Sequence, residues 1–293
     1  MKAFSQFHPI VSAVYFAVVI VTVMLVSDPV LQAEALLGGA LFAGMQFPAR
    51  RNLKRALYYC VFALIIVATN PLFSHNGATV LFSVGRFSVA LEAFYYGCGM
   101  AALMISVIVW CELLSVVITD EKFMYLLGRV LPKLSLVLSY TIRLVPVIVR
   151  RIRRVSGAQK TMGLYSEDSR LNRIRSRGEV LRTVVTWSLE SSVDTSLSMS
   201  ARGYGLRGRT TFSRFRFGGK DAALLALTAA LATVVFVGAA KGAVGITYYP
   251  TVVFGGFNGR SLPVYFAFFC LTLTPFAVEC KEEIKWKYCV SKI

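Results

Sequence analysis

Long uncharged runs alternate with short polar breaks along most of the chain, and this pattern predicts membrane-spanning helices. About 20 consecutive apolar residues are needed to cross a bilayer as a helix. Six such runs occur, each ending at a Pro, Gly, Asp or charged cluster. They lie at about 10–26, 30–47, 53 or 56 to 69, 94–119, 222–240 and 262–278. We therefore predict an all-α polytopic membrane protein with about six transmembrane helices.

The run at 130–149 is also apolar, but it contains Lys133 and Arg143. As a seventh span it would bury Arg143 and move the basic cluster at 150–154 to the outside. Cytoplasmic segments carry the excess of Lys and Arg, so we interpret this run as a helix at or below the membrane surface. Both termini, the basic loop 49–55 and the segment 120–220 are then cytoplasmic.

Three parts follow from this topology. Residues 1–119 form an N-terminal membrane part with four spans, and residues 221–293 form a C-terminal part with two spans and a basic tail. Residues 120–220 form the cytoplasmic segment between them. The first run is longer than a signal-peptide core, so we expect it to be retained. The stretch 72–89 is left open, as an external loop or a re-entrant piece.

The cytoplasmic segment is predicted to be a hairpin of two long helices, at about 134–162 and 179–203. Pro146 is expected to kink the first helix. In the second, apolar residues four apart form one stripe, which is Leu181, Val185, Leu189, Val193, Leu197 and Ala201. Gly203 suits the left-handed turn after the last helical residue. Arg202 beside it is either a helix-capping cation or a contact for a partner.

Charge and composition narrow the function. The chain has 293 residues, 56% of them hydrophobic, and a net charge of +17. The segment 120–220 has 20 Lys and Arg against 7 Asp and Glu, so it carries +13 of that charge. Topology accounts for this charge, and no nucleic-acid-binding motif accompanies it, so no nucleic acid is expected as a partner. The alternating Phe and Arg of 212–217 favour contact with anionic lipids.

Candidate chemistry is sparse. The six cysteines are dispersed without CxxC spacing and are expected to be buried small hydrophobes, and the two histidines stand alone. We therefore predict no metal site and no cofactor. No nucleotide-binding G-x-x-x-x-G-K-[ST] motif and no Ser/His/Asp constellation occurs, so the chain is predicted not to be an enzyme.

Three short motifs lie in order along the cytoplasmic segment, at or near the predicted helix ends. They are Arg143-Leu144-Val145-Pro146, Ala158-Gln159-Lys160-Thr161-Met162-Gly163 and Ser200-Ala201-Arg202-Gly203-Tyr204. With the basic hairpin they resemble the T component of energy-coupling factor (ECF) transporters. The close resemblance covers about Glu92 to Tyr204, and Leu91-Glu92-Ala93 is similar to the step that opens that family's fourth span.

The resemblance implies a membrane scaffold whose two coupling helices dock on a pair of ABC-type ATPases. A separate small membrane subunit would bind the vitamin or transition-metal ion, in the inner membrane of a bacterial or archaeal cell. The implied docking residues are Ala201, Arg202, Gly203 and Tyr204 on the second helix and Ala158, Gln159, Met162 and Gly163 on the first, with Arg143 and Pro146 as structural residues. The family's first motif ends in Arg-Gly, whereas Met162 stands at that position here.

Two other functions stay open at this point. One is a secondary transporter that uses the intramembrane carboxylates Glu112 and Glu92, since a carboxylate is costly in hydrocarbon and needs a reason to be there. The other is an integral membrane enzyme that modifies lipids, with the basic segment holding a phosphate headgroup.

Overall fold

The computed structural model of the protein describes residues 4–73, 79–84, 87–163, 170–206, 215–248, 252–254 and 259–291. The chain forms two compact units, and each is described by itself. The first consists of Met1–Phe123 with Phe215–Ile293, and the second of Met124–Arg214.

Six long helices pack together in the described part of the first unit. They are α1 (Pro9–Leu25), α2 (Pro29–Gln46), α3 (Ala49–Phe73), α4 (Leu91–Val117), α8 (Gly219–Ala240) and α9 (Leu262–Val290), with a 3-10 helix at Phe4–Gln6 before α1. Each of the six predicted runs falls in one of them. Of these, α3, α4, α8 and α9 are long and apolar enough to cross a membrane, and α1 is a shorter apolar helix. The predicted all-α polytopic membrane protein is confirmed.

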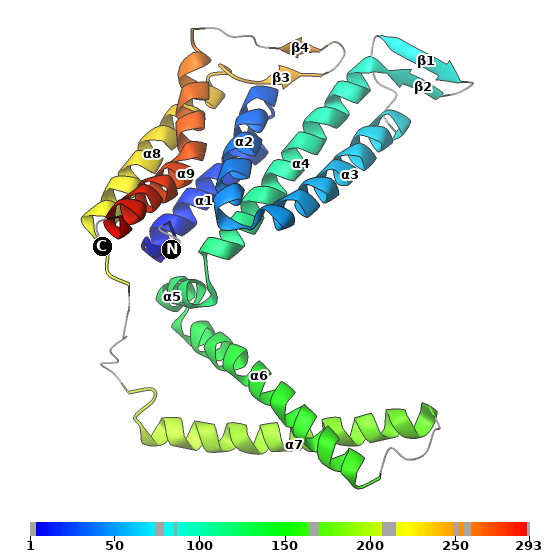
Figure 1. Ribbon diagram of the computed structural model, residues 1–293, viewed down its shortest axis with the longest axis vertical. Helices are drawn as coiled ribbons and strands as arrows, with labels where there is room; N and C mark the ends of the chain where they lie inside the picture. The colour runs from blue at the N-terminus through cyan, green and yellow to red at the C-terminus, as the bar shows by residue number, and fades with distance from the viewer. Residues whose placement is uncertain are drawn as a thin grey trace. The chain divides into compact units, whose positions relative to one another are not determined.

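Polar contacts tie the helices together at both ends of the bundle. At one end lie the N- and C-termini, the end of α4 and the start of α8 (Figure 1). There the buried Glu279 carboxylate of α9 accepts from the Phe4 N–H at 3.2 Å. At the opposite end, the buried Asp28 carboxylate accepts from the Gly245 N–H at 3.0 Å and from the Tyr265 hydroxyl at 3.1 Å.

The core of the bundle is aromatic where α1, α2 and α4 meet. Phe4 and Tyr15 have ring centroids 5.4 Å apart, and the buried Trp110 donates its indole N–H to the Ala35 carbonyl at 3.0 Å. Close packing of α2 on α4 requires a small residue at Gly39, where a Cβ would lie 2.9 Å from a Val109 methyl. Gly44, by contrast, has open space beside it, so the close contact is confined to the part of α2 around Gly39.

Short antiparallel hairpins connect two pairs of helices. Strands β1 (Val80–Val84) and β2 (Phe87–Ala90) pair between α3 and α4, and β3 (Ile246–Thr247) pairs with β4 (Val253–Phe254) between α8 and α9. The stretch 72–89, left open by the sequence, thus contains a β-hairpin after the end of α3.

Two helices run through residues predicted to be connections or tails, and these boundaries were wrong. The helix α3 begins at Ala49, so the basic stretch 49–55 forms its first turns, and it continues past Pro71 to Phe73. The helix α9 continues beyond residue 278 through the basic tail to Val290. Lys and Arg are good helix formers, so charge alone does not end a helix.

The second unit is built from two long helices. They are α6 (Pro132–Thr161) and α7 (Arg170–Ala201), preceded by α5 (Asp120–Val130), whose later residues belong to this unit. The helix α7 begins nine residues before the predicted 179, so the predicted start was wrong. The predicted turn at 166–169 lies outside the described residues.

By length and apolar composition alone, α6 also qualifies as a span, although none of its apolar window is buried. It crosses α7 and packs against it (Figure 1), so the two helices of the predicted hairpin are in contact. Its position at or below the membrane surface stays a prediction from the charge bias.

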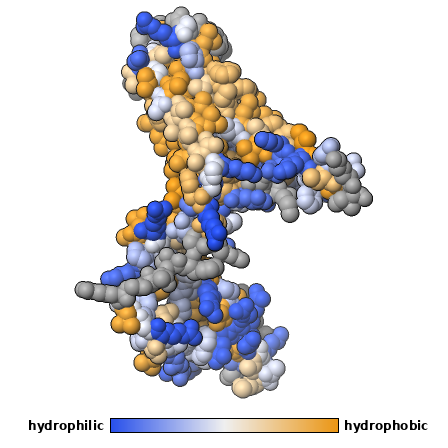
Figure 2. All heavy atoms as spheres, turned by 90° about the vertical axis from the view of Figure 1, so that its left-hand side faces the viewer, coloured by the Kyte–Doolittle hydropathy of each residue, from blue (hydrophilic) through white to orange (hydrophobic). Residues whose placement is uncertain are grey.

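The surface of the bundle is largely hydrophobic on the face shown in Figure 2. The cysteines are exposed or half-buried, which corrects the prediction that they are buried. Cys60, Cys98, Cys111 and Cys289 are exposed, and Cys270 and Cys280 are half-buried. An apolar run of a spanning helix includes residues that face lipid, so apolar neighbours in sequence do not imply burial by protein.

Candidate functional site

Both long helices of the second unit end at a glycine in the left-handed conformation. Met162 caps the C-terminus of α6, and the glycine after it, Gly163, has φ +78°. Arg202 follows the last residue of α7, and Gly203 after it also has φ +78°. The two helices end at these glycines, as predicted. Glycine suits the position, because other residues adopt the left-handed conformation only at a cost in free energy. Met162 and Arg202 therefore occupy equivalent positions.

Backbone hydrogen bonds close the end of α7 without help from a side chain. The Tyr204 N–H donates to the Met199 carbonyl at 3.0 Å, and the Gly203 N–H donates to the Ser200 carbonyl at 3.0 Å. These two bonds are the pair that defines a Schellman turn, which satisfies the last carbonyls of a helix. The Arg202 guanidinium is thus not required as a hydrogen-bonding cap.

The two ends differ in the side chain that they present. Met162 is 76% exposed and offers an apolar thioether, whereas Arg202 is exposed and offers a guanidinium. Ala158, Ala201 and Tyr204 are exposed as well, and Gln159 is half-buried. The carboxamide oxygen of Gln159 is buried and accepts no hydrogen bond within the described residues.

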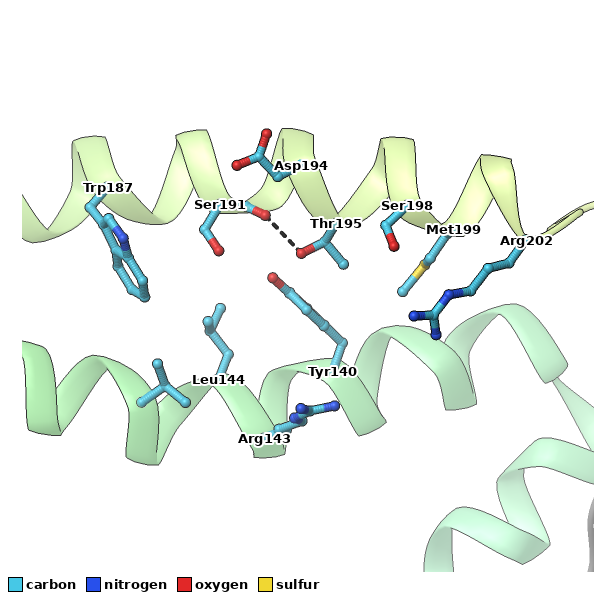
Figure 3. A pocket seen from close by; sticks show the side chains of 11 residues that line it. Tyr140, Arg143, Leu144, Trp187, Ser191, Asp194, Thr195, Ser198, Met199 and Arg202 are labelled. Carbon is cyan, nitrogen blue, oxygen red and sulfur yellow. Dashed lines mark hydrogen bonds between the residues drawn. The ribbon is translucent and has the colours of Figure 1, made fainter.

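A groove of about 480 Å³ lies between α6 and α7 near the Arg202 end (Figure 3). Its lining residues are Tyr140, Arg143, Leu144 and Val147 of α6, and Trp187, Ser191, Asp194, Thr195, Ser198, Met199 and Arg202 of α7 and its end. In Figure 3 the Tyr140 side chain extends toward Thr195, and the Arg202 side chain reaches toward α6. The groove therefore brings Arg143, predicted to be structural, near the predicted docking residue Arg202.

The groove continues into the contact between the helices. The Arg151 guanidinium lies over the Trp187 ring, 4.7 Å from its centroid, which is close enough for a cation–π contact. Val184 and Val180, one and two turns before Trp187, are the buried residues in the part of α7 whose side chains the structure describes. Pro146 lies inside α6 and is exposed, and its predicted kink remains a prediction.

The predicted apolar stripe of α7 does not form the contact with α6. Its residues Leu181, Val185, Leu189, Val193 and Leu197 are 48–65% exposed. The packed side of the helix instead follows Val180, Val184 and Trp187. An apolar stripe on an exposed helix face requires cover by lipid or by another protein.

The intramembrane carboxylates are both occupied by neighbours. Glu112 of α4 forms an ion pair with Arg55 and accepts from the Tyr59 hydroxyl at 2.9 Å. The buried Glu92 accepts from the Thr79 hydroxyl at 2.7 Å and from its N–H at 3.1 Å. The sequence showed no partner for Glu112, because Arg55 is distant in the chain. These contacts explain the carboxylates without an ion-binding role.

Metal chemistry finds no support in the described residues. They contain no group of three His, Cys, Asp or Glu side chains that could hold a metal ion. His8 caps α1 through its ring nitrogen, which accepts from the Ile10 N–H at 3.3 Å, and His75 lies outside the described residues.

Sequence reasoning missed most of the groove. Tyr140 and Trp187 were not singled out, because an aromatic residue on an amphipathic helix usually packs in a core. Spacing in the sequence does give a polar stripe on α7, which includes Asp194 and Ser198 of the lining. Only the partner helix shows that this face borders a groove.

Comparison with known proteins agrees with this architecture. Residues 3–212 match the family described as CbiQ, cobalt transport protein. This match includes both helix ends and stops before α8. Among named proteins, the chain is similar to the energy-coupling factor transporter transmembrane protein EcfT of Listeria innocua, with 25% identity over 185 residues, or 59% of this chain and 70% of that protein.

Two further proteins of the same name show similar likeness. EcfT of Streptococcus thermophilus is 25% identical over 177 residues, covering 56% of this chain and 67% of that protein. EcfT of Bacillus selenitireducens is 31% identical over 97 residues, covering 32% of this chain and 36% of that protein.

Proposed function

Because the chain belongs to the CbiQ family of cobalt transport proteins, we propose that it is the transmembrane coupling subunit of an ECF-type ABC importer. In this role it transmits motion from two separate ATPase subunits to a small membrane subunit that binds the solute. The solute is a vitamin or a transition-metal ion. The family's description favours the metal ion, whereas the names of the similar proteins refer to energy coupling.

The observation that carries the proposal is the matched ending of α6 and α7. Each helix presents one exposed side chain just before a left-handed glycine, and at Arg202 that side chain is a planar cation. Because the Schellman turn already satisfies the backbone, Arg202 is available to bind carboxylates of a partner through its fork of N–H donors. This arrangement supports the proposed docking of two helix ends on two ATPase subunits.

A second observation supports an apolar partner. The stripe from Leu181 to Leu197 is exposed on α7, and such a face needs lipid or a membrane protein against it. The solute-binding subunit fits that requirement. Anionic lipids fit the +13 charge of residues 120–220. ATP hydrolysis belongs to other polypeptides, because the sequence lacks a nucleotide-binding loop.

The test compares Arg202→Ala and Arg202→Lys with Met162→Ala in the chain purified from its native membrane. Losing a charged contact in a partner groove costs about 2–5 kcal/mol of binding, so both Arg202 variants are expected to lose ATPase subunits and solute uptake. Lysine keeps the charge but loses the planar fork. Met162→Ala is expected to have a smaller effect, since a thioether makes no charged bond.

Arg182→Ala serves as the control, because Arg182 is an exposed arginine of the same helix far from its end. It is expected to retain ATPase subunits and uptake. Full activity of Arg202→Lys would return Arg202 to a capping role, since either cation favours a helix C-terminus. A larger loss from Met162→Ala than from Arg202→Ala would move the main docking point to α6.

A further inference from the structure

The groove between α6 and α7 is lined by several hydrogen-bond donors that have no partner among the described residues. Within the described residues, neither Arg143 nor Arg202 forms an ion pair or a side-chain hydrogen bond. The hydroxyl groups of Tyr140, Ser191 and Ser198 likewise have no hydrogen-bond partner among these residues. Two guanidinium groups and three hydroxyls therefore line one space of about 480 Å³.

These donors select an anion with several acceptor oxygens. Arginine forks match carboxylates and phosphates, and hydroxyls complete such a shell. The one acidic side chain of the lining is Asp194, whose carboxylate points to the other side of α7 from Tyr140 (Figure 3). Leu144, Val147 and Met199 supply apolar surface beside the donors, which suits the stem of an acidic side chain and its aliphatic neighbours.

The position of the groove on α7 argues against a lipid headgroup. Each residue turns a helix by about 100°, so residues two apart lie on nearly opposite faces. Ser191 lines the groove, while Leu189 and Val193 belong to the exposed apolar stripe. A membrane or apolar partner that covers the stripe therefore leaves the groove on the opposite, water-facing side.

We propose that this groove receives an acidic side chain from the ATPase subunit that docks at the end of α7. The inference rests on the proposed function, since Arg202 is both the docking residue and one wall of the groove. It adds a second cation, Arg143, which lies outside the docking motif. The contact is then reciprocal. The end of α7 docks on the ATPase subunit, and a segment of the ATPase subunit enters the groove between α6 and α7.

Charge variants test the sign of the ligand. Arg143→Gln is expected to reduce the retained ATPase by about tenfold to a hundredfold, as for the loss of a charged hydrogen bond. Asp194→Asn is expected to increase retention, because it removes a negative charge from the lining of the groove. The matched control is Arg153→Gln, an exposed arginine of α6 outside the groove, with retention as in the unmodified chain. Weaker retention in Asp194→Asn together with normal retention in Arg143→Gln would overturn the proposal.

Photo-crosslinking identifies the occupant directly. The variant Tyr140→p-benzoylphenylalanine carries the probe into the groove, and Val145→p-benzoylphenylalanine carries it on an exposed position of α6 outside it. We expect the first to crosslink, in native membranes, to a peptide of an ATPase subunit that contains Asp or Glu. A phospholipid adduct, or no adduct while ATPase subunits still copurify, would refute this inference and leave the proposed function intact. Failure of the unmodified chain to copurify with any ATPase would instead refute the proposed function.

Discussion

At the scale of single residues, Arg202 shows how a backbone turn makes a side chain available. The Schellman bonds satisfy the helix end, so a cation there is free to act elsewhere. At the end of α6, Met162 likewise stands before a left-handed glycine, so the departure from the family's motif changes the side chain that is presented there. Glu112 gives the opposite lesson, because its ion pair with Arg55 removes the need for a transport role.

Lys122, near the start of α5, is a buried amine without a hydrogen-bond partner in the described residues. It is 3% exposed, and burial lowers its pKa, an effect that the nearby Asp221 carboxylate partly offsets. Asp221 is already engaged, since it accepts from the His8 N–H and the Gly218 N–H, both at 2.9 Å.

We predict that Lys122→Met raises the thermal stability of the protein at pH 7. An unsatisfied buried donor costs about 1–3 kcal/mol, and methionine removes it. When the pKa of a lysine is lower in the folded state than in the unfolded state, the unfolded state binds more protons at pH values between the two. The free energy of unfolding therefore rises as the pH increases above the pKa of the folded state. The gain from Lys122→Met is therefore expected to shrink between pH 7 and pH 10. Thermal unfolding of the detergent-purified protein and its variant at pH 7 and at pH 10 measures the gain at each pH.

Lys220→Met is the control for this prediction, because Lys220 is exposed beside Asp221. Its effect is expected within about 0.5 kcal/mol. A lower melting temperature for Lys122→Met would mean that the amine has a stabilising partner.

At the scale of elements, α7 has two faces with different surroundings. One face packs on α6 and borders the groove, and the other exposes the apolar stripe. The end of the helix then directs Arg202. This division depends on a long regular helix. The helix continues through Gly178 in its interior and ends before the left-handed Gly203.

The same substitution at these two glycines is predicted to have opposite effects. Gly203→Ala forces alanine into a left-handed conformation at about 1–2 kcal/mol, so the turn changes and Arg202 is redirected. Gly178→Ala sits in the helix interior with open space around it and is expected to stabilise α7 by about 0.5–1 kcal/mol. Thermal unfolding and ATPase copurification measure the two effects. Normal copurification of Gly203→Ala would show that the turn does not direct the docking contact.

At the scale of the whole molecule, the bundle has two distinct ends. The termini, the end of α4 and the start of α8 lie at one end, and the β-hairpins lie at the other (Figure 1). The positive charge of the chain is concentrated in the segment that begins and ends at the first of these. The charge bias therefore predicts that this end of the bundle faces the cytoplasm.

Cysteine labelling tests this orientation in a variant whose six native cysteines are replaced. Lys241→Cys and Arg260→Cys, both exposed in the connection between α8 and α9, are expected to react with impermeant thiol reagents in intact cells. Arg51→Cys, Met162→Cys and Ser291→Cys are expected to react only after the membrane is opened. Labelling of Met162→Cys from outside would contradict the cytoplasmic position of the hairpin.

The sequence alone determined the fold class, the six helices of the bundle, the helical hairpin and the family. These depend on local properties, namely runs of apolar residues, charge bias and residues such as Gly203 that end helices. The motifs were enough to place Met162 and Arg202 at equivalent positions of the two helix ends. The resemblance to the T component is confirmed by the family match.

Only the tertiary structure decided which face of α7 packs, what Glu112 contacts and where Arg143 lies. The apolar stripe predicted from spacing is exposed, while Val180 and Val184 are buried. Spacing shows which residues share a face, but a partner element decides which face is covered. Arg55 and Glu112 lie on different helices, and only the packing of α3 on α4 brings them together as an ion pair. In the same way, only the packing of α6 on α7 brings Arg143 and Arg202 to one groove.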